Sequence, residues 1–224
     1  MPGRDIPLVT GEIYHIFNKG IAGQPTFNTK RDYNRFLETM FYYQNKDIPI
    51  RLSKLATLHS EQKSEILNYL NKKKQFIVDI VAYCLMPNHF HLLIKQTENN
   101  GTAKYTANIT NSHTRYFNIK NKREGPLFKG KFQAVRIESE EQLLHVTRYI
   151  HLNPYSSYIV KTTNDLLSYK YSSLRKYLGL EENQSIDTQT ILAHFKSLET
   201  FKKFIFDQAD YQRQLERIKH LILE

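Results

Sequence analysis

Two histidines separated by one residue have the types and spacing to hold half of a metal site. His89 and His91 flank Phe90 in the mainly apolar stretch YCLMPNHFHLLIK, residues 83–95. Because side chains alternate faces along a β-strand, both imidazoles would project from one face while the phenyl ring enters the other. Imidazole nitrogens are common metal ligands. The spacing therefore predicts a metal-binding pair on a strand, with two packed or surface histidines as the alternative.

A second group of candidate residues follows further along the chain. Ser139 begins a capping box, apolar residues recur at helical spacing, and Pro154 disfavours continuation, so residues 139–153 are predicted to form an amphipathic helix. Tyr149 and Asn153 are four residues apart and therefore share one face of it. A phenol and an amide in this arrangement are compatible with a nucleophile beside a metal ligand, with ordinary packing as the alternative.

Other side chains compete for these roles. Tyr116 is a rival nucleophile on a second predicted helix, although Lys120 stands four residues later, where the first pair has an amide. His113 and His145 are predicted to lie on helix surfaces, and His145 could approach the metal as an outer group. His15, in an early strand, is expected to have a structural role near the site.

Together the two groups resemble the single-tyrosine HUH transposases, and more closely their REP-associated tyrosine transposase branch. The resemblance extends from residue 12 to about residue 180 and rests on four stretches: YHIFNKG at 14–20, MPNHFHLL at 86–93, GPLFKGKF at 125–132 and RYIHLNP at 148–154. It implies that His89 and His91 bind a divalent metal, that Asn153 completes the site, and that Tyr149 attacks DNA. Several relatives have glutamine at the position of Asn153.

The expected elements alternate without a regular parallel crossover pattern. They are strands at 12–18, 76–83, 90–95 and 132–137 and helices at 30–46, 61–70, 102–118 and 139–153, with a bend or short hairpin at Pro87-Asn88. This order predicts an α+β fold with a mainly antiparallel sheet. The resemblance implies a ferredoxin-like or RRM-like sheet with the histidines on a central strand. Residues 1–180 are predicted to form the catalytic domain and residues 181–224 a helical C-terminal appendage.

The charge of the chain predicts a polyanionic partner. The 224 residues carry a net charge of +10, and the pI is about 9.5, so the surface gains free energy by releasing counterions from phosphates. RNA or an anionic membrane would also fit the charge alone. The candidate DNA-binding residues are Lys104, Arg115, Lys120, Lys122, Arg123, Lys129, Lys131, Arg136 and Arg148. Phe117, Phe128 and Phe132 lie among them and could stack on unpaired bases, with a place in the core as the alternative.

The remaining composition favours a reducing location away from membranes. The most apolar stretch, residues 80–86, is far shorter than the roughly twenty residues of a spanning helix, and no signal peptide is visible. Cys84 is the single cysteine, which rules out an intrachain disulfide and a cysteine-rich zinc site. We expect Cys84 to be an inert core residue and the protein to be cytoplasmic.

These residues support one leading chemistry and two alternatives. A tyrosine hydroxyl has a pKa near 10 and needs help to attack phosphorus, which Mg²⁺ or Mn²⁺ would supply at a site without sulfur, although zinc also remains open. The leading hypothesis is cleavage and transfer of single-stranded or hairpin DNA through a 5′-phosphotyrosine at Tyr149, by a monomer or a homodimer. The alternatives are a non-catalytic nucleic-acid-binding module and a replication or relaxase-type nickase.

Overall fold

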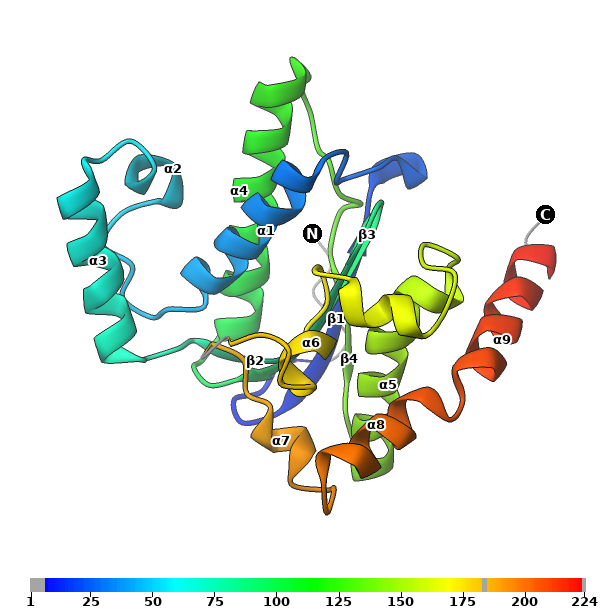
Figure 1. Cartoon of the computed structure of the whole chain (residues 1–224). Coiled ribbons are helices and arrows are strands. Elements are labelled where there is room, and N and C mark those ends of the chain that lie inside the picture. The colour runs from blue at the N-terminus through cyan, green and yellow to red at the C-terminus, as the bar shows by residue number, and fades with distance from the viewer. Residues whose placement is uncertain (1–6, 183–184, 223–224) are drawn as a thin grey trace.

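The computed structural model describes residues 7–182 and 185–222, and its central element is a twisted sheet flanked by helices (Figure 1). The strands are β1 (Ile13–Lys19), β2 (Val78–Met86), β3 (His89–Gln96) and β4 (Gln133–Arg136). The helices of the first half are η1 (Ile21–Gly23), α1 (Lys30–Tyr43), α2 (Leu52–Leu55), α3 (Ser60–Lys73) and α4 (Gly101–Asn121). Those of the second half are α5 (Glu140–Ser156), η2 (Asn164–Ser168), α6 (Leu174–Tyr177), α7 (Gln189–Leu192), α8 (Leu198–Phe206) and α9 (Ala209–Ile222).

The strand order in the described sheet is β2-β3-β1-β4, and every neighbouring pair is antiparallel. Helical segments connect β1 to β2, and α4 connects β3 to β4, which gives the β-α-β-β-α-β order of ferredoxin-like folds. The predicted α+β class is therefore confirmed. The histidine strand β3 is central, as the resemblance implied, because it lies between β2 and β1.

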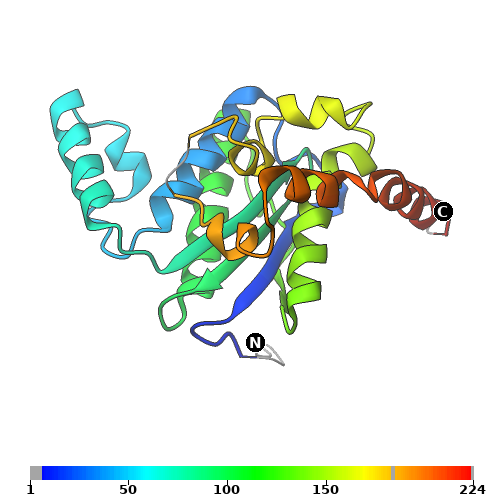
Figure 2. The ribbon, with the colours of Figure 1, turned by 60° about the horizontal axis from the view of Figure 1, so that its bottom comes forward.

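The two faces of the sheet have different covers. Helices α1 and α4 lie together on one face, and α5 lies on the other, with α8 and α9 beside it (Figures 1 and 2). Phe90 faces the first layer, where its ring centroid is 5.3 Å from that of Phe36 in α1. His91 faces the second layer, where its ring meets Tyr149 of α5. Neighbouring residues of β3 thus face opposite layers. Phe90 packs in the core, and His91 belongs to the histidine site.

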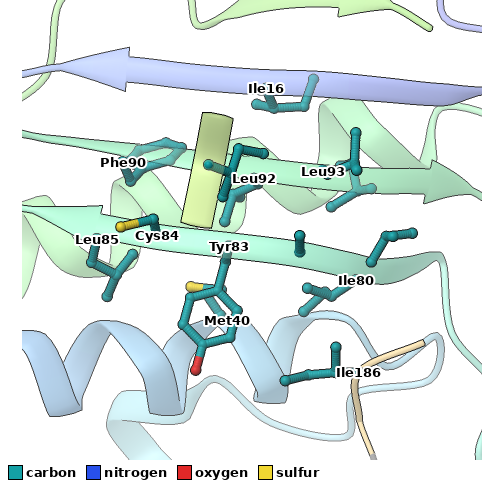
Figure 3. Close-up of a cluster of buried hydrophobic side chains, with 14 of the residues drawn as sticks. Ile16, Met40, Ile80, Tyr83, Cys84, Leu85, Phe90, Leu92, Leu93 and Ile186 are labelled. Atoms are coloured by element: carbon teal, nitrogen blue, oxygen red, sulfur yellow. The ribbon is translucent and has the colours of Figure 1, made fainter. Parts of the chain in front are cut away.

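The core between these layers is apolar and continuous. Figure 3 shows Ile80, Phe90 and Leu92 within it, and each of them is fully buried. Cys84 is also fully buried and unpaired, and burial raises the pKa of its thiol, so the expected inert core role is confirmed. Burial of this many large apolar side chains removes their surface from water and fixes the sheet that carries the histidines.

Two local predictions needed the structure to settle them. Pro87 and Asn88 form a two-residue turn, so β2 and β3 make a tight hairpin rather than a bend within one strand. Helix α5 does begin after Ser139, whose hydroxyl oxygen accepts from the Gln142 N–H. However, α5 continues through Pro154 to Ser156, contrary to the predicted end at 153. Proline in the last turn removes only one N–H donor, and the tertiary contacts of the helix offset that loss.

Helices α8 and α9 pack against α5 (Figure 2). Phe201 and Ile205 of α8 are fully buried and belong to the same apolar cluster as the sheet. The predicted helical appendage, residues 181–224, contains the described helices α7, α8 and α9, and residues 193–197 between α7 and α8 are not helical. Residues 183–184 and 223–224 of that prediction lie outside the described residues. None of the described helices has the length and apolar character needed to cross a membrane.

Candidate active site

The β2–β3 hairpin places the two histidines at one end of a central strand. His89 is the first residue of β3, and the His89 and His91 rings are 4.9 Å apart between centroids at an interplanar angle of 89°. Phe90 points to the other face and is fully buried. The alternation expected from the sequence therefore brings the imidazoles together on one face.

One ring nitrogen of each histidine is held by a neighbouring side chain. His89 Nδ1 lies 2.6 Å from Asn88 Oδ1, and His91 Nδ1 lies 3.0 Å from His15 Nε2. The asparagine oxygen can only accept, so His89 carries its proton on Nδ1 and presents the Nε2 lone pair outward. A metal shared by the two rings would therefore bind them through Nε2. Such outer contacts fix the tautomer and orientation of metal-binding imidazoles.

Burial keeps the His15 and His89 rings uncharged at neutral pH. Burial lowers the pKa of His15 to about 4. Burial, with the positive charge of Lys19, lowers the pKa of His89 to about 4 as well. At neutral pH a neutral imidazole retains the lone pair that a metal ligand needs.

Helix α5 brings the tyrosine to the histidines across the second layer. The Tyr149 ring meets His91 edge-on, with centroids 5.4 Å apart at 84°, and meets His15 at 6.1 Å and 73°. Tyr149 is half-buried, whereas His91 is 6% exposed. Residues from β1, β3 and α5 therefore form one cluster, with the phenol on its outer side.

Asn153 lies one helical turn beyond the tyrosine and is 4% exposed. Its side-chain nitrogen donates to the Tyr149 carbonyl oxygen at 2.9 Å. This bond orients the amide, so the side-chain oxygen is the atom that could serve as a metal ligand. Tyr149 and Asn153 are neighbours on α5 because they are four residues apart, as the sequence predicted.

The donor set fits a hard divalent ion completed by substrate oxygens. Within the described ranges, no three His, Cys, Asp or Glu side chains come together as a metal-binding group. Two imidazoles and an amide oxygen would supply three ligands and would leave coordination positions for water and phosphate. The third imidazole, His15, contacts His91 instead of adding a ligand.

The rival tyrosine belongs to the other layer. Tyr116 lies on α4, where its hydroxyl donates to Asp32 at 3.0 Å, so it cannot act at the histidine pair in this arrangement. His113 is fully buried, and its Nε2 lies 2.9 Å from the Thr26 carbonyl oxygen. The predicted surface position of His113 is therefore wrong, because its ring packs among Phe27, Phe36 and Phe128. His145 is exposed on α5, as predicted.

The predicted DNA-binding residues divide into several groups. Arg115 and Lys120 lie on the outer side of α4, and Lys122, Arg123, Lys129 and Lys131 occupy its end and the loop before β4. Lys104 is exposed near the other end of α4. Arg136 on β4 forms an ion pair with Glu12 at 2.7 Å.

Three aromatic or basic predictions need correction. Arg148 is 6% exposed, with its guanidinium carbon 3.7 Å from the centroid of the Phe204 ring, because α8 covers that face of α5. It is therefore not a surface contact for phosphate in this arrangement. Phe117 and Phe128 are 5% and 6% exposed and pack in the core, so they do not offer faces to unpaired bases. Phe132 is half-buried beside the core.

Sequence reasoning missed two features of the molecule. It gave His15 no defined partner, since the diagonal contact with His91 across two strands is set by their register. It also passed over Arg31, Arg35 and Arg51, which line a groove with residues of α4. The four-residue spacing of Arg31 and Arg35 on a predicted helix was the available signal.

Comparison with known proteins gives one family match and structural similarity to solved proteins. Residues 51–153 match the family model described as "Transposase IS200 like", and they include both paired histidines, Tyr149 and Asn153. Residues 51–153 are therefore similar to the IS200-like transposases. No curated protein matches the chain. A solved structure of a REP-associated tyrosine transposase bound to a REP hairpin is similar, with a TM-score of 0.49 and 12% identity over 84% of this chain and 98% of that chain.

Proposed function

We propose that this protein cleaves and rejoins single-stranded DNA through a covalent bond between Tyr149 and a 5′ phosphate. The observation that carries the proposal is the edge-on approach of the Tyr149 ring to His91 from a helix on the same face of the sheet. A tyrosine used only for packing would have no need of paired imidazoles beside it. The family match supports action on DNA. The roles of individual residues are inferred from the geometry of the site.

The reaction exchanges one phosphodiester for another. The Tyr149 oxygen attacks phosphorus and loses its proton to solvent, while the bond from phosphorus to the 3′ oxygen breaks and that oxygen gains a proton. Phosphotyrosine keeps the energy of the broken ester, so a 3′ hydroxyl of another strand can reverse the step and release the tyrosine without ATP. A divalent metal, when bound, would draw charge from the phosphate oxygens and from the departing 3′ oxygen.

The chain's own residues have distinct parts in this scheme. His89 and His91 would hold the ion, with Asn153 as a third ligand through its side-chain oxygen. His15 positions His91 through the 3.0 Å contact between their ring nitrogens. The Tyr149 ring is half-buried, which keeps it beside the histidines. Helix α5, which carries it, packs on the sheet.

The proposed substrate is single-stranded DNA that carries a hairpin. The basic residues at the end of α4 and in the loop before β4 lie near the histidine end of the sheet, because Lys129 N–H donates to the Lys19 carbonyl oxygen and Lys19 pairs with His89. These cations would attract the phosphates next to the cleavage point. Mg²⁺ and Mn²⁺ are the proposed ions.

A covalent adduct on a denaturing gel tests the proposal. The protein is incubated with a hairpin-bearing single-stranded oligonucleotide and Mn²⁺, and a band of protein-linked DNA is expected. Tyr149→Phe should remove the band and keep DNA binding, since the substitution deletes the hydroxyl alone. Tyr116→Phe is the matched control on the other layer and should keep the band.

Other outcomes would redirect the assignment. An adduct that persists in Tyr149→Phe and disappears in Tyr116→Phe would move the nucleophile to α4 and overturn the proposed site at Tyr149. Tight, metal-independent binding with no adduct across many hairpins would favour the non-catalytic binding module. Nicking without rejoining of an added strand would favour a nickase.

A further inference from the structure

Lys19 is the last residue of β1 and lies directly opposite His89, the first residue of β3. Side chains that lie opposite one another on antiparallel strands share a face of the sheet, with Cβ atoms about 4.5 to 5.5 Å apart. The Lys19 side chain therefore leaves the sheet on the face that carries the two histidines. It is exposed, whereas His89 is half-buried and His91 is buried.

The backbone and the side chain of Lys19 both have fixed neighbours. Its carbonyl oxygen accepts from the Lys129 N–H at 2.7 Å. Its side chain passes η1, where a Cβ added at Gly23 would lie 3.9 Å from Lys19 Cε. Asn88 joins the same glycine to the site, because its amide nitrogen donates to the Gly23 carbonyl oxygen at 3.2 Å while its side-chain oxygen holds His89. The stem of Lys19 is thus fixed beside the histidine end of the sheet.

The ammonium group of Lys19 is available to a substrate. Among the residues that the structure describes, no ion pair or hydrogen bond joins it to another side chain. Its charge reaches the site, since it is the cause, after burial, that lowers the pKa of His89. A lysine ammonium group carries three N–H donors. Lys19 therefore brings protons that can be transferred to the end of the histidine pair.

The candidate nucleophile approaches the histidines from the other end. The Tyr149 ring lies 5.4 Å from that of His91 and 6.1 Å from that of His15. His15 and Lys19 share a face of β1, and four residues of strand span about 13 Å. The attacking and leaving oxygens of a phosphoryl transfer lie in line on opposite sides of phosphorus. A phosphate at the histidine pair would therefore have Tyr149 on one side and Lys19 on the other.

The departing 3′ oxygen needs a proton that the neighbouring rings are poorly suited to give. Burial keeps His15 and His89 uncharged at neutral pH. The remaining N–H of His89 is bound to the Asn88 side-chain oxygen at 2.6 Å. A 3′ alkoxide is a strong base, and protonation of such a leaving group by a positioned side chain contributes about 10²- to 10⁴-fold to a rate. The end of the site where Lys19 lies is where such a group is required.

We propose that Lys19 is the proton donor to the departing 3′ oxygen, a catalytic role that rests on the proposed function and adds a residue to it. As the bond from phosphorus to the 3′ oxygen breaks, a Lys19 N–H transfers its proton to that oxygen, and the lysine is left as a neutral amine. When a 3′ hydroxyl of another strand attacks the phosphotyrosine, the same amine takes the proton of that hydroxyl and becomes ammonium again. The released Tyr149 oxygen takes a proton from solvent. One residue thus serves both cleavage and rejoining.

A substrate with sulfur in place of the bridging 3′ oxygen tests this role. A thiol has a pKa of about 8.5, so its thiolate departs without a proton. The sulfur is placed at the cleavage point mapped on the ordinary hairpin oligonucleotide, and adduct formation is followed in a single turnover with saturating protein and Mn²⁺. On ordinary DNA, Lys19→Met should form the adduct about 100-fold more slowly, or slower still. On the sulfur substrate it should react nearly as fast as wild-type protein.

Two further variants separate proton transfer from charge and from position. Lys19→Arg keeps the positive charge, but a guanidinium group does not give up its proton in proteins. We therefore expect it to bind the hairpin as wild-type protein does, measured by fluorescence anisotropy without metal, and to be slow on ordinary DNA alone. Lys95→Met is the matched control, because Lys95 lies on β3 at the far end from His89, opposite Ile13. It should match wild-type protein on both substrates.

Equal slowing of Lys19→Met on both substrates would overturn the inference, because a lost charge or a disturbed fold affects either leaving group alike. A wild-type rate on ordinary DNA in Lys19→Met or in Lys19→Arg would also overturn it. In both cases wild-type protein still forms the adduct, so the role of Tyr149 stands and that of Lys19 alone fails. If wild-type protein forms no adduct at Tyr149 on either substrate, the proposed function fails and the role of Lys19 fails with it.

Discussion

His15 Nε2 lies 3.0 Å from His91 Nδ1, so a residue of the first strand directly holds the second histidine of the pair. The register of β1 against β3 creates this contact, because His15 lies opposite Leu93 and reaches diagonally to His91. The two rings are nearly parallel, with centroids 5.1 Å apart. One nitrogen of this pair must donate and the other accept, which couples the tautomer of His91 to that of His15.

Removing the hydrogen bond from His15 is expected to weaken metal binding. His15→Phe keeps a ring in place without a hydrogen-bonding nitrogen, and we expect a fall of about 10- to 100-fold in Mn²⁺ affinity. His15→Gln, which can still hydrogen-bond, should retain more of it. Electron paramagnetic resonance titration of Mn²⁺ measures this without DNA. His59→Gln, at an exposed site directly before α3, is the control, and unchanged affinity in His15→Phe would contradict the positioning role.

Chelation of the metal is expected to separate binding from cleavage. A chelator should abolish the covalent adduct while hairpin binding remains, because the basic residues that are proposed to contact phosphate are separate from the histidines. Mg²⁺ or Mn²⁺ should restore the adduct in wild-type protein, and His89→Ala should not respond. Adduct formation that survives exhaustive chelation in wild-type protein would show that the two imidazoles act by another means.

Asp32 is expected to be a major contributor to stability. Its buried carboxylate accepts from the backbone N–H groups of Asn28 and Thr29 and from the side chains of Tyr116 and Lys120. It thereby caps α1 and joins it to α4. Asp32→Ala should lower the free energy of unfolding by roughly 2 to 4 kcal/mol, because it leaves several donors unpaired. Urea denaturation measures the change, with Asp47→Asn at an exposed ion pair as the control.

The contribution of Asp32 should depend on pH. Burial alone would raise the pKa of this carboxyl, but the hydrogen bonds from Lys120, Thr29, Tyr116 and Asn28 lower it below the ordinary value of 3.8. A carboxyl with a lowered pKa in the folded state stabilises the protein above its ordinary pKa and loses that contribution as pH falls through the folded value. The stability difference between wild type and Asp32→Ala should therefore narrow below about pH 4. A constant difference from pH 3 to 7 would contradict this account.

A mixing experiment is expected to show that each chain carries a complete site. Tyr149 and His91 approach one another within one chain, so Tyr149→Phe mixed with His89→Ala should form no adduct. Exchange of α5 between two copies would instead restore adduct in the mixture. Co-expression of the two variants with different tags, followed by purification through both, ensures that any mixed dimer is present in the assay.

Sequence alone determined the local features of this protein. The alternation around Phe90 placed His89 and His91 on one face, and the four-residue spacing placed Tyr149 and Asn153 on one side of a helix, because these relations depend only on strand and helix periods. The same reasoning identified the main strands and helices and the α+β class. It missed the course of α5 through Pro154, since packing against other elements decides whether a late proline is tolerated.

Tertiary structure decided which of these features meet. Only the fold shows that α5 brings Tyr149 to His91 and that Tyr116 points to the opposite layer, because no local period relates residues on different elements. It also placed Arg148 under Phe204 and joined Arg31 to Arg115 across a groove. Burial and long-range contacts depend on how the layers stack. The sequence of a helix shows which of its faces is apolar, but it does not show which surface covers that face.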